Sequence, residues 1–159
     1  MKFRLLTLFF ILFTSELSFG QTYVDSIADN LTNKTQKEQL QSILSIPYDK
    51  FVGDLVTSEE LAQKAITIAT ELDDLFGLAQ ANQFLSQVYA YQDNRVKKMI
   101  FNLKAIQIFE EIGRFDRAGY AYCELGFTIK REDFDTGLHY MRKGLELLER
   151  SEAYKIDAA

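Results

Sequence analysis

An internal repeat with a period of about 40 residues constrains this 159-residue chain more than any other feature of its sequence. Residues 79–112 resemble residues 119–151, and the second half of the unit recurs once more upstream. The aligned positions are Ala81 with Ala121, Leu85-Ser86 with Leu125-Gly126, and Ala65 with Ala105 and Gly144. A period in this range, with two amphipathic stretches in each unit, predicts stacked helical hairpins and disfavours most enzyme folds.

Apolar residues recur at helical spacing through most of the chain. They predict helices over 58–73, 78–92, 95–112, 116–131 and 134–150, and no segment alternates as a strand would. Thr35-x-x-Glu38 and Thr57-x-x-Glu60 have the pattern of capping boxes, which begin helices. Pro47 should kink or end the helix that starts near residue 35. Asp73-Asp74 with Gly77 and Asp93-Asn94 predict turns, and Gly113 suits a helix C′ position with positive φ.

The amino terminus has the three parts of a signal peptide. Lys2 and Arg4 precede an apolar run over 5–13, and the small residues Ser18 and Gly20 end a polar segment. We expect cleavage after Gly20, although an uncleaved anchor is the alternative. The run is too short to span a bilayer, and no later segment is long and apolar enough. The expected location is therefore periplasmic or extracellular, with no membrane span in the mature chain.

The repeated residues resemble the tetratricopeptide (TPR) repeat family. The first helix of that family carries a Leu, a small residue and then an aromatic, as in Leu85-Ser86 with Tyr89. Leu125-Gly126 repeats the pattern with Ile129 in the aromatic position. The second small position is Ala65, Ala105 and Gly144, whereas the first is occupied by Lys98 and Gly137. The period of about 40 exceeds the usual value of about 34 for this family.

The resemblance implies an all-α, right-handed solenoid of about three antiparallel helical hairpins. We divide the chain into a signal peptide (1–20), a polar leader (21–34) with one short helix, and a TPR-like domain (35–159). Its expected units are 35–74, 75–114 and 115–151. Ala153 to Ala159 align with the opening of a first helix, so we expect residues 152–159 to begin a further unit. An uncovered last unit should fray first or self-associate through the carboxyl-terminal repeat.

The sequence offers little for catalysis, metal binding or a cofactor. His139 is the single histidine and Cys123 the single cysteine, and on different helices they do not make up a metal-ligand set. We expect an exposed helical histidine and a small, buried, unreactive thiol. Phosphate-binding loops and nucleophile elbows are absent. The net charge of -5 without clustered Lys and Arg disfavours nucleic acid as a partner.

A binding groove is the favoured site, because the first helices of TPR arrays line a concave surface. Counting from Leu85 and Leu125 gives the groove-facing positions. They are Gln80, Gln83, Gln87, Tyr120, Cys123, Phe127, Lys130 and Arg131. Amides and aromatics with a basic end suit an extended peptide or a neighbouring helix of a partner protein. The alternative of equal weight is that these residues pack against the next repeat.

Two functions follow. The first is an exported TPR-like protein or peptide interaction domain. Long-period arrays behind an export signal resemble the sensory or scaffold portion of bacterial signalling and regulatory proteins. The second is the non-catalytic helical part of an exported enzyme whose catalytic domain lies outside this chain. We expect no enzymatic activity from the chain itself.

Overall fold

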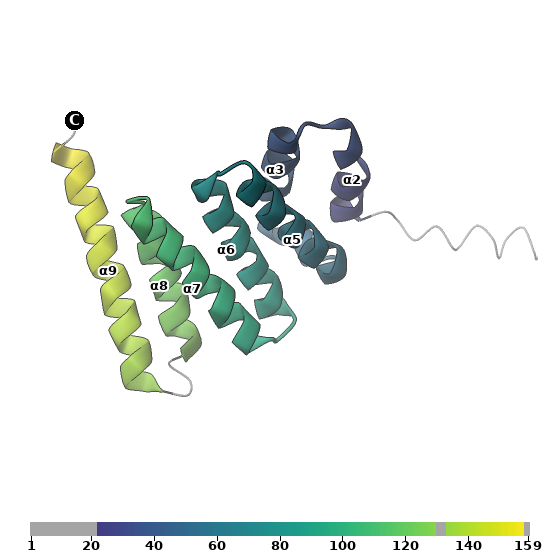
Figure 1. The fold of residues 1–159 in the computed structure, drawn as a ribbon. Coiled ribbons are helices and arrows are strands. Elements are labelled where there is room, and N and C mark those ends of the chain that lie inside the picture. The colour runs from purple at the N-terminus through teal and green to yellow at the C-terminus, as the bar shows by residue number, and fades with distance from the viewer. Residues whose placement is uncertain (1–21, 130–132, 158–159) are drawn as a thin grey trace, which may run out of the picture.

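Helices make up all the regular structure of the described residues, 22–129 and 133–157, in the computed structural model of the chain. Side chains are described for 22–129 and 133–151. The elements are α2 (Tyr23–Asp29), the 3-10 turn η1 (Leu31–Asn33), α3 (Gln36–Leu44), α4 (Tyr48–Phe51), α5 (Leu55–Glu71), α6 (Leu75–Tyr91), α7 (Arg95–Glu111), α8 (Phe115–Ile129) and α9 (Phe134–Asp157). Consecutive long helices pack side by side and reverse direction at short turns (Figure 1).

Three turns between the long helices have the same backbone geometry. Each has one residue with positive φ, at Asp73 (52°), Asp93 (55°) and Gly113 (71°). The next residue donates its N–H to a carbonyl five residues back, the Schellman arrangement that closes a helix end. Helices α5, α6, α7 and α8 therefore start 20 residues apart. The prediction for Gly113 is confirmed, and Asp fills the same position twice because it tolerates the left-handed region.

Asx caps begin α5, α6 and α7. The Asp54, Asp74 and Asn94 side chains accept backbone N–H groups of the first turns of α5, α6 and α7. The turn predicted at Asp93-Asn94 is confirmed, as is the capping box of Thr35 and Glu38. The box predicted at Thr57 is wrong, because Asp54 caps α5 three residues earlier and accepts the Thr57 hydroxyl at 2.8 Å.

Gly77 is also not a turn residue. It lies in the first turn of α6 and donates its N–H to Asp74 at 2.8 Å. A Cβ at this position would stand 2.6 Å from that carboxylate, so the capped helix needs a glycine here.

Residues 22–34 of the predicted leader contribute to the core of the molecule. The one short helix predicted there is present as α2. In addition, Val24 and Leu31 are fully buried against the following helices. Thr22 and Asp25 form a capping box that begins α2. Pro47 ends the α3 region as predicted, since it stands at the N-cap of α4 after a break at Ser45 and Ile46.

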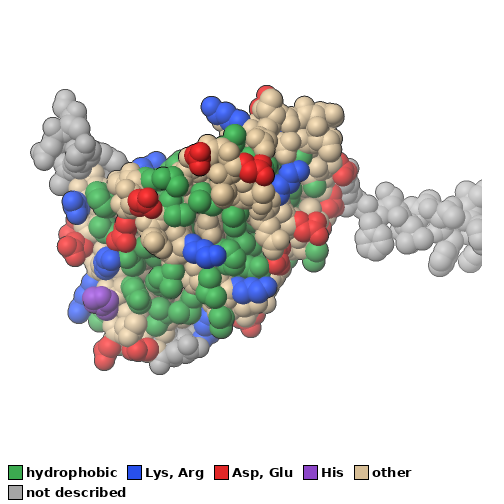
Figure 2. Space-filling model, viewed as in Figure 1, with side chains coloured by type: hydrophobic (Ala, Val, Ile, Leu, Met, Phe, Trp, Pro, Cys, Tyr) green, Lys and Arg blue, Asp and Glu red, His purple; other side chains and the backbone are tan. Residues whose placement is uncertain are grey.

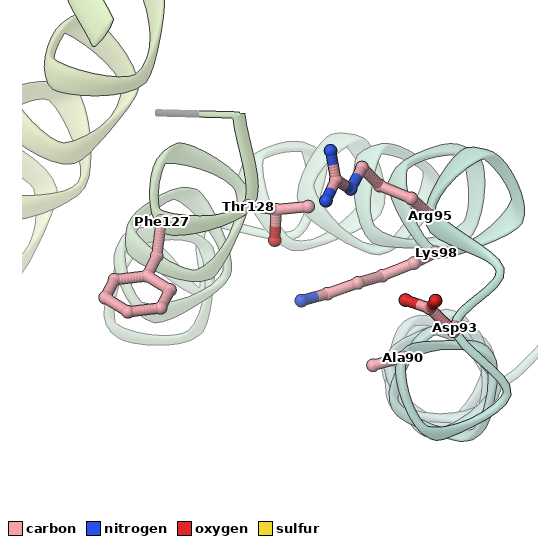
Figure 3. Close-up of a pocket in the computed structure, with 6 residues that line it drawn as sticks. All are labelled: Ala90, Asp93, Arg95, Lys98, Phe127 and Thr128. Atoms are coloured by element: carbon pink, nitrogen blue, oxygen red, sulfur yellow. The ribbon is translucent and has the colours of Figure 1, made fainter. Parts of the chain in front are cut away.

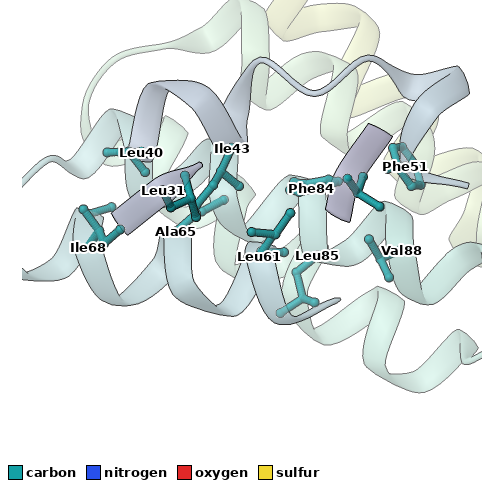
Figure 4. Close-up of a cluster of buried hydrophobic side chains, with 14 of the residues drawn as sticks. Leu31, Leu40, Ile43, Phe51, Leu61, Ala65, Ile68, Phe84, Leu85 and Val88 are labelled. Atoms are coloured by element: carbon teal, nitrogen blue, oxygen red, sulfur yellow. The ribbon is translucent and has the colours of Figure 1, made fainter. Parts of the chain in front are cut away.

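Two clusters of buried apolar side chains stabilise the molecule. The first joins α2 to α6 and includes Leu31, Leu61 and Leu85 (Figure 4). The second joins α6 to α9 around Phe109 and Leu125. Leu85 and Leu125 are each 1% exposed, so the predicted burial of the two repeat-equivalent leucines is confirmed. Helix α6 supplies residues to both clusters and links the two halves.

Glycines bring α8 and α9 into backbone contact. A Cβ on Gly126 would lie 2.5 Å from the Gly137 carbonyl oxygen, and one on Gly119 would lie 2.7 Å from that of Gly144. The two helices thus approach each other closely at Gly126 and Gly144. In the preceding hairpin, the Ser86 hydroxyl occupies the space of Gly126 and donates to the Lys98 carbonyl at 2.9 Å.

The last helix differs from expectation. Residues 152–157 continue α9 without a turn, whereas the repeat alignment predicted the start of a further unit at 152–159. The physical reason is local: between Leu148 and Asp157 the chain has no glycine, proline or asparagine to end the helix.

An apolar stripe lies on the outside of α7. Val96, Ile100 and Leu103 share one helix face and are 70%, 46% and 42% exposed. Figure 2 shows hydrophobic side chains gathered across the middle of the face on which α7 lies toward the viewer. Within the described residues, none of the helices is both long and apolar enough to cross a membrane.

Candidate functional site

A hollow of about 240 Å³ lies between α3, α4 and α6. The predicted Gln80, Gln83 and Gln87 form its α6 wall. They lie at spacings of three and four residues, so they follow one face of that helix. Its other lining residues are Ile43, Leu44, Ile46, Tyr48, Phe51 and Phe84. The hollow thus combines an apolar floor with a row of amides.

Aromatic side chains close one end of this hollow. Phe51 of α4 meets the rings of Tyr48, Phe84 and Tyr91 edge-on, with centroid distances of 5.2, 5.4 and 5.6 Å. The hydroxyls of Tyr48 and Tyr91 are hydrogen-bonded to each other. Four rings from α4 and α6 therefore make a rigid end wall that presents two hydroxyls.

The carboxylate of Glu124 stands where the amide row of α6 meets α8. The side-chain amides of Gln83 and Gln87 lie close enough to stabilise its charge, and so does Lys98 of α7. The charge of Glu124 also acts on the Tyr48 hydroxyl. Side chains from α4, α6, α7 and α8 thus converge on one carboxylate, and none of the ion pairs found within the described residues includes it.

Burial raises the pKa of Glu124 above the usual glutamate value. The Lys98 charge and the two nearby amides lower this pKa but do not cancel the effect of lost solvent. The pKa of Tyr48 is raised by its hydrogen bond with Tyr91, by burial and by the negative charge of Glu124. Among the described residues, this carboxylate therefore lacks a full counter-charge.

A second hollow, of about 220 Å³, continues the groove beyond Glu124. Ala90, one turn after Gln87 on α6, lines it together with Asp93, Arg95, Lys98, Phe127 and Thr128. Figure 3 shows Lys98 reaching from α7 across this hollow toward α8, with Asp93 near its base. Because Phe127 and Thr128 lie one turn after Glu124, the carboxylate lies between the two hollows. We call the two hollows and Glu124 together the α6–α8 groove.

The predicted site residues divide into three groups. The three glutamines lie together in the first hollow, and Phe127 lies in the second, 58% exposed. Tyr120 is also on the surface of α8, at 60% exposed, and lines neither hollow. Lys130 and Arg131 lie outside the described residues.

The placement of Cys123 in the groove is wrong. Its sulfur faces α9, where it is 3.9 Å from the Met141 carbonyl oxygen and in the space that a Cβ on Gly144 would need. Burial raises the pKa of this thiol, as the interpretation of a packed, unreactive cysteine requires. The reason for the error is the close α8–α9 approach, which draws the residue toward its partner helix.

Sequence reasoning missed Glu124, Tyr48 and Lys98. The sequence did contain a signal for Glu124, because the repeat alignment pairs this residue with Phe84, which is buried. A carboxylate at a repeat position that is otherwise apolar marks a place where the chain departs from simple packing. Tyr48 and Lys98 carry no comparable signal, since both come to the groove through the tertiary arrangement of α4 and α7.

A third hollow, of about 630 Å³, is larger but its polar groups are already paired. Arg114 makes two hydrogen bonds to Asp116, at 3.0 and 2.9 Å, and these hold the pKa of Asp116 at about 2. The guanidinium of Arg150 lies 4.5 Å from the centroid of Phe115. These contacts join the α7–α8 turn to α9, so they account for the residues there without a ligand.

The described residues contain no group of three or more side chains suited to hold a metal ion. His139 is on the surface of α9, as expected, with its ring 5.9 Å from that of Tyr140. Comparison of the chain with protein-family models, with curated proteins and with solved structures finds no match.

Proposed function

We propose that this protein is a TPR-like interaction domain that binds an extended peptide segment of a partner protein in the α6–α8 groove. The observation that carries the proposal is the convergence of Gln83, Gln87 and Glu124 between two hollows. The arrangement of hairpins as a right-handed TPR-like solenoid is part of the same proposal. It is supported by the repeated turns and by the shared burial of Leu85 and Leu125.

The shape and chemistry of the groove favour a peptide over a small molecule. Each hollow is smaller than the roughly 300–1,000 Å³ typical of small-molecule sites. A glutamine whose amide lies beside Glu124 has a carbonyl oxygen able to accept a peptide N–H. Main-chain hydrogen bonds from an extended segment, with side chains entering the two hollows, fit such a row of amides.

We further propose that the protein is exported and serves as the sensory or scaffold portion of a larger signalling or regulatory protein. The pattern of Lys2 and Arg4 before an apolar run supports export, although residues 1–21 lie outside the described part of the chain. Amino-terminal sequencing of protein from the native host tests this step. A start at Gln21 supports export, and an intact Met1 in the cytoplasm contradicts it.

A displayed library of random octapeptides tests the peptide-binding proposal. We expect enriched peptides to bind the wild-type protein and to lose at least tenfold in affinity for Gln87→Arg, whose longer side chain fills the groove. Gln107→Arg, the same change at an exposed position of α7, is the matched control and should bind normally. Failure to enrich any peptide, or equal binding by both variants, would refute peptide binding in this groove.

A further inference from the structure

The Glu124 carboxylate is held in a way that specifies the charge of its ligand. It is partly buried, the neutral amides of Gln83 and Gln87 stand beside it, and Lys98, a cation that acts on its charge, forms no ion pair with it in the described part of the chain. A charge removed from water is costly unless it is paired, so this site gains most from a ligand that brings a positive group. An acidic ligand would instead add repulsion.

We propose, on the basis of the peptide-binding function above, that the α6–α8 groove selects a segment with a lysine or arginine side chain that pairs with Glu124. The amides of Gln83 and Gln87 stand beside the carboxylate, and a guanidinium or ammonium would add a charge-assisted hydrogen bond to it. The aliphatic stem of the ligand side chain would lie along the apolar floor that Ile46 and Phe84 provide.

The surroundings of Glu124 agree with a cationic side chain. Tyr48 and Tyr91 form the end wall on one side, and aromatic rings favour a nearby cation. On the other side, Figure 3 shows the long Lys98 side chain spanning the second hollow, which Asp93 and Arg95 also line. Lys98 stands on a flexible stem, so an entering cation can displace it toward Asp93. Lys98 therefore competes with the ligand.

This competition predicts opposite effects from two substitutions. Glu124→Gln keeps the size and hydrogen-bonding capacity of the side chain and removes its charge. It should weaken binding of a basic peptide about tenfold, because a charge-assisted contact is lost. Lys98→Gln removes the competitor and should strengthen the same binding several-fold. A purely structural role for Glu124 would not produce effects of opposite sign.

The test uses an arginine-containing octapeptide enriched from the library and a copy with citrulline in place of that arginine, which is isosteric and uncharged. Fluorescence anisotropy gives the affinities of wild type, Glu124→Gln and Lys98→Gln. Glu146→Gln, at an exposed position of α9, controls for the change in net charge. Thermal unfolding checks that each variant is folded. We expect wild type to prefer arginine over citrulline about tenfold and Glu124→Gln to bind the two peptides equally.

The other outcomes overturn the inference in distinguishable ways. If enriched peptides bind in the groove, as Gln87→Arg reports, but show no basic residue or no response to Glu124→Gln, peptide binding stands and the charge selection is wrong. Enrichment of acidic peptides that depend on Lys98 would likewise contradict it. If no peptide binds, or if Gln87→Arg has no effect, both the function and the inference fail.

Discussion

The hairpins α6–α7 and α8–α9 occupy equivalent places in the repeat but are packed by different means. In the first, Ser86 donates a hydrogen bond across the hairpin and Asn102 is buried beside the core. In the second, Gly126 and Gly137 bring the two backbones into contact. The same repeat position can thus be occupied by serine or by glycine, and with glycine the two helix backbones are in contact.

The same comparison explains where the groove arises. Phe84 packs against the Phe51 ring of α4, whereas Glu124, its repeat equivalent, faces the amides of α6. An apolar residue at this position packs against an apolar residue of the neighbouring helix. A carboxylate at the same position leaves a polar surface between them, and that surface is the candidate site.

The largest expected effect tests whether the two hairpins contribute equally to stability. Leu85→Ala and Leu125→Ala each remove a side chain that is 1% exposed, and each should lower the free energy of unfolding by about 2–5 kcal/mol. Urea unfolding followed by circular dichroism measures both. A loss below about 0.5 kcal/mol at either leucine would show that the two positions are not equivalent.

Because Gly126 contacts the backbone of α9, substitution by alanine should cost more stability at Gly126 than at its repeat equivalent, Ser86. Gly126→Ala should destabilise the protein by about 1–3 kcal/mol, because the new Cβ would meet backbone atoms of α9 at 2.5 and 2.9 Å. This loss should outweigh the roughly 1 kcal/mol by which alanine favours a helix. Ser86→Ala, the matched change in the other hairpin, should cost about 1 kcal/mol. Stabilisation by Gly126→Ala would contradict the close backbone approach.

Replacing Asn102 with an apolar residue should raise the stability of the protein. Asn102 is 1% exposed, and neither its side-chain nitrogen nor its oxygen has a hydrogen-bond partner. Its repeat equivalent in α9 is Met141. Asn102→Met should therefore stabilise the protein by about 1 kcal/mol, since an unpaired buried amide costs about 1–3 kcal/mol and some repacking is needed. In contrast, Asn82→Met should destabilise it, because the Asn82 amide donates to the Leu78 carbonyl at 2.8 Å.

The smallest expected effect is a pH dependence of stability. Glu124 introduces it because its side chain titrates, whereas that of its repeat equivalent Phe84 does not. The pKa of Glu124 is raised in the folded state, so its carboxyl group stays protonated to higher pH in the folded protein than in the unfolded chain. Its contribution therefore favours the folded state at low pH and is lost as the pH rises through the glutamate range and beyond.

Glu124→Gln should consequently gain stability over wild type as the pH is raised through that range. Thermal unfolding at a series of pH values measures the difference, with Glu146→Gln as the matched control. A difference that stays constant, or that shrinks with rising pH, would mean that the carboxylate is better solvated than the structure has it.

Local patterns predicted most of the helices but not how they meet. The capping box at Thr35, the break at Pro47 and the positive φ at Gly113 depend on a few neighbouring residues, so the sequence alone was sufficient. The start of α5 was misassigned because Asp54 and Thr57 are both good caps and their competition is settled by packing.

The site was predictable in part for the same reason. Gln80, Gln83 and Gln87 follow from the face of one helix. The roles of Glu124 and Lys98 depend on the distance between helices, which no single-helix pattern contains. Cys123 was misplaced because the glycines of α8 and α9 bring those helices closer than ordinary side-chain packing would.

The most direct test of the α6–α8 groove is to follow side-chain amide signals of the protein by NMR while a library-selected basic peptide is added. We expect the Gln83 and Gln87 signals to shift as the peptide saturates and the signal of the exposed Gln107 to stay unchanged. Shifts confined to the outer face of α7, around Val96, Ile100 and Leu103, with Gln83 and Gln87 unchanged, would place binding on the apolar stripe and contradict binding in the α6–α8 groove.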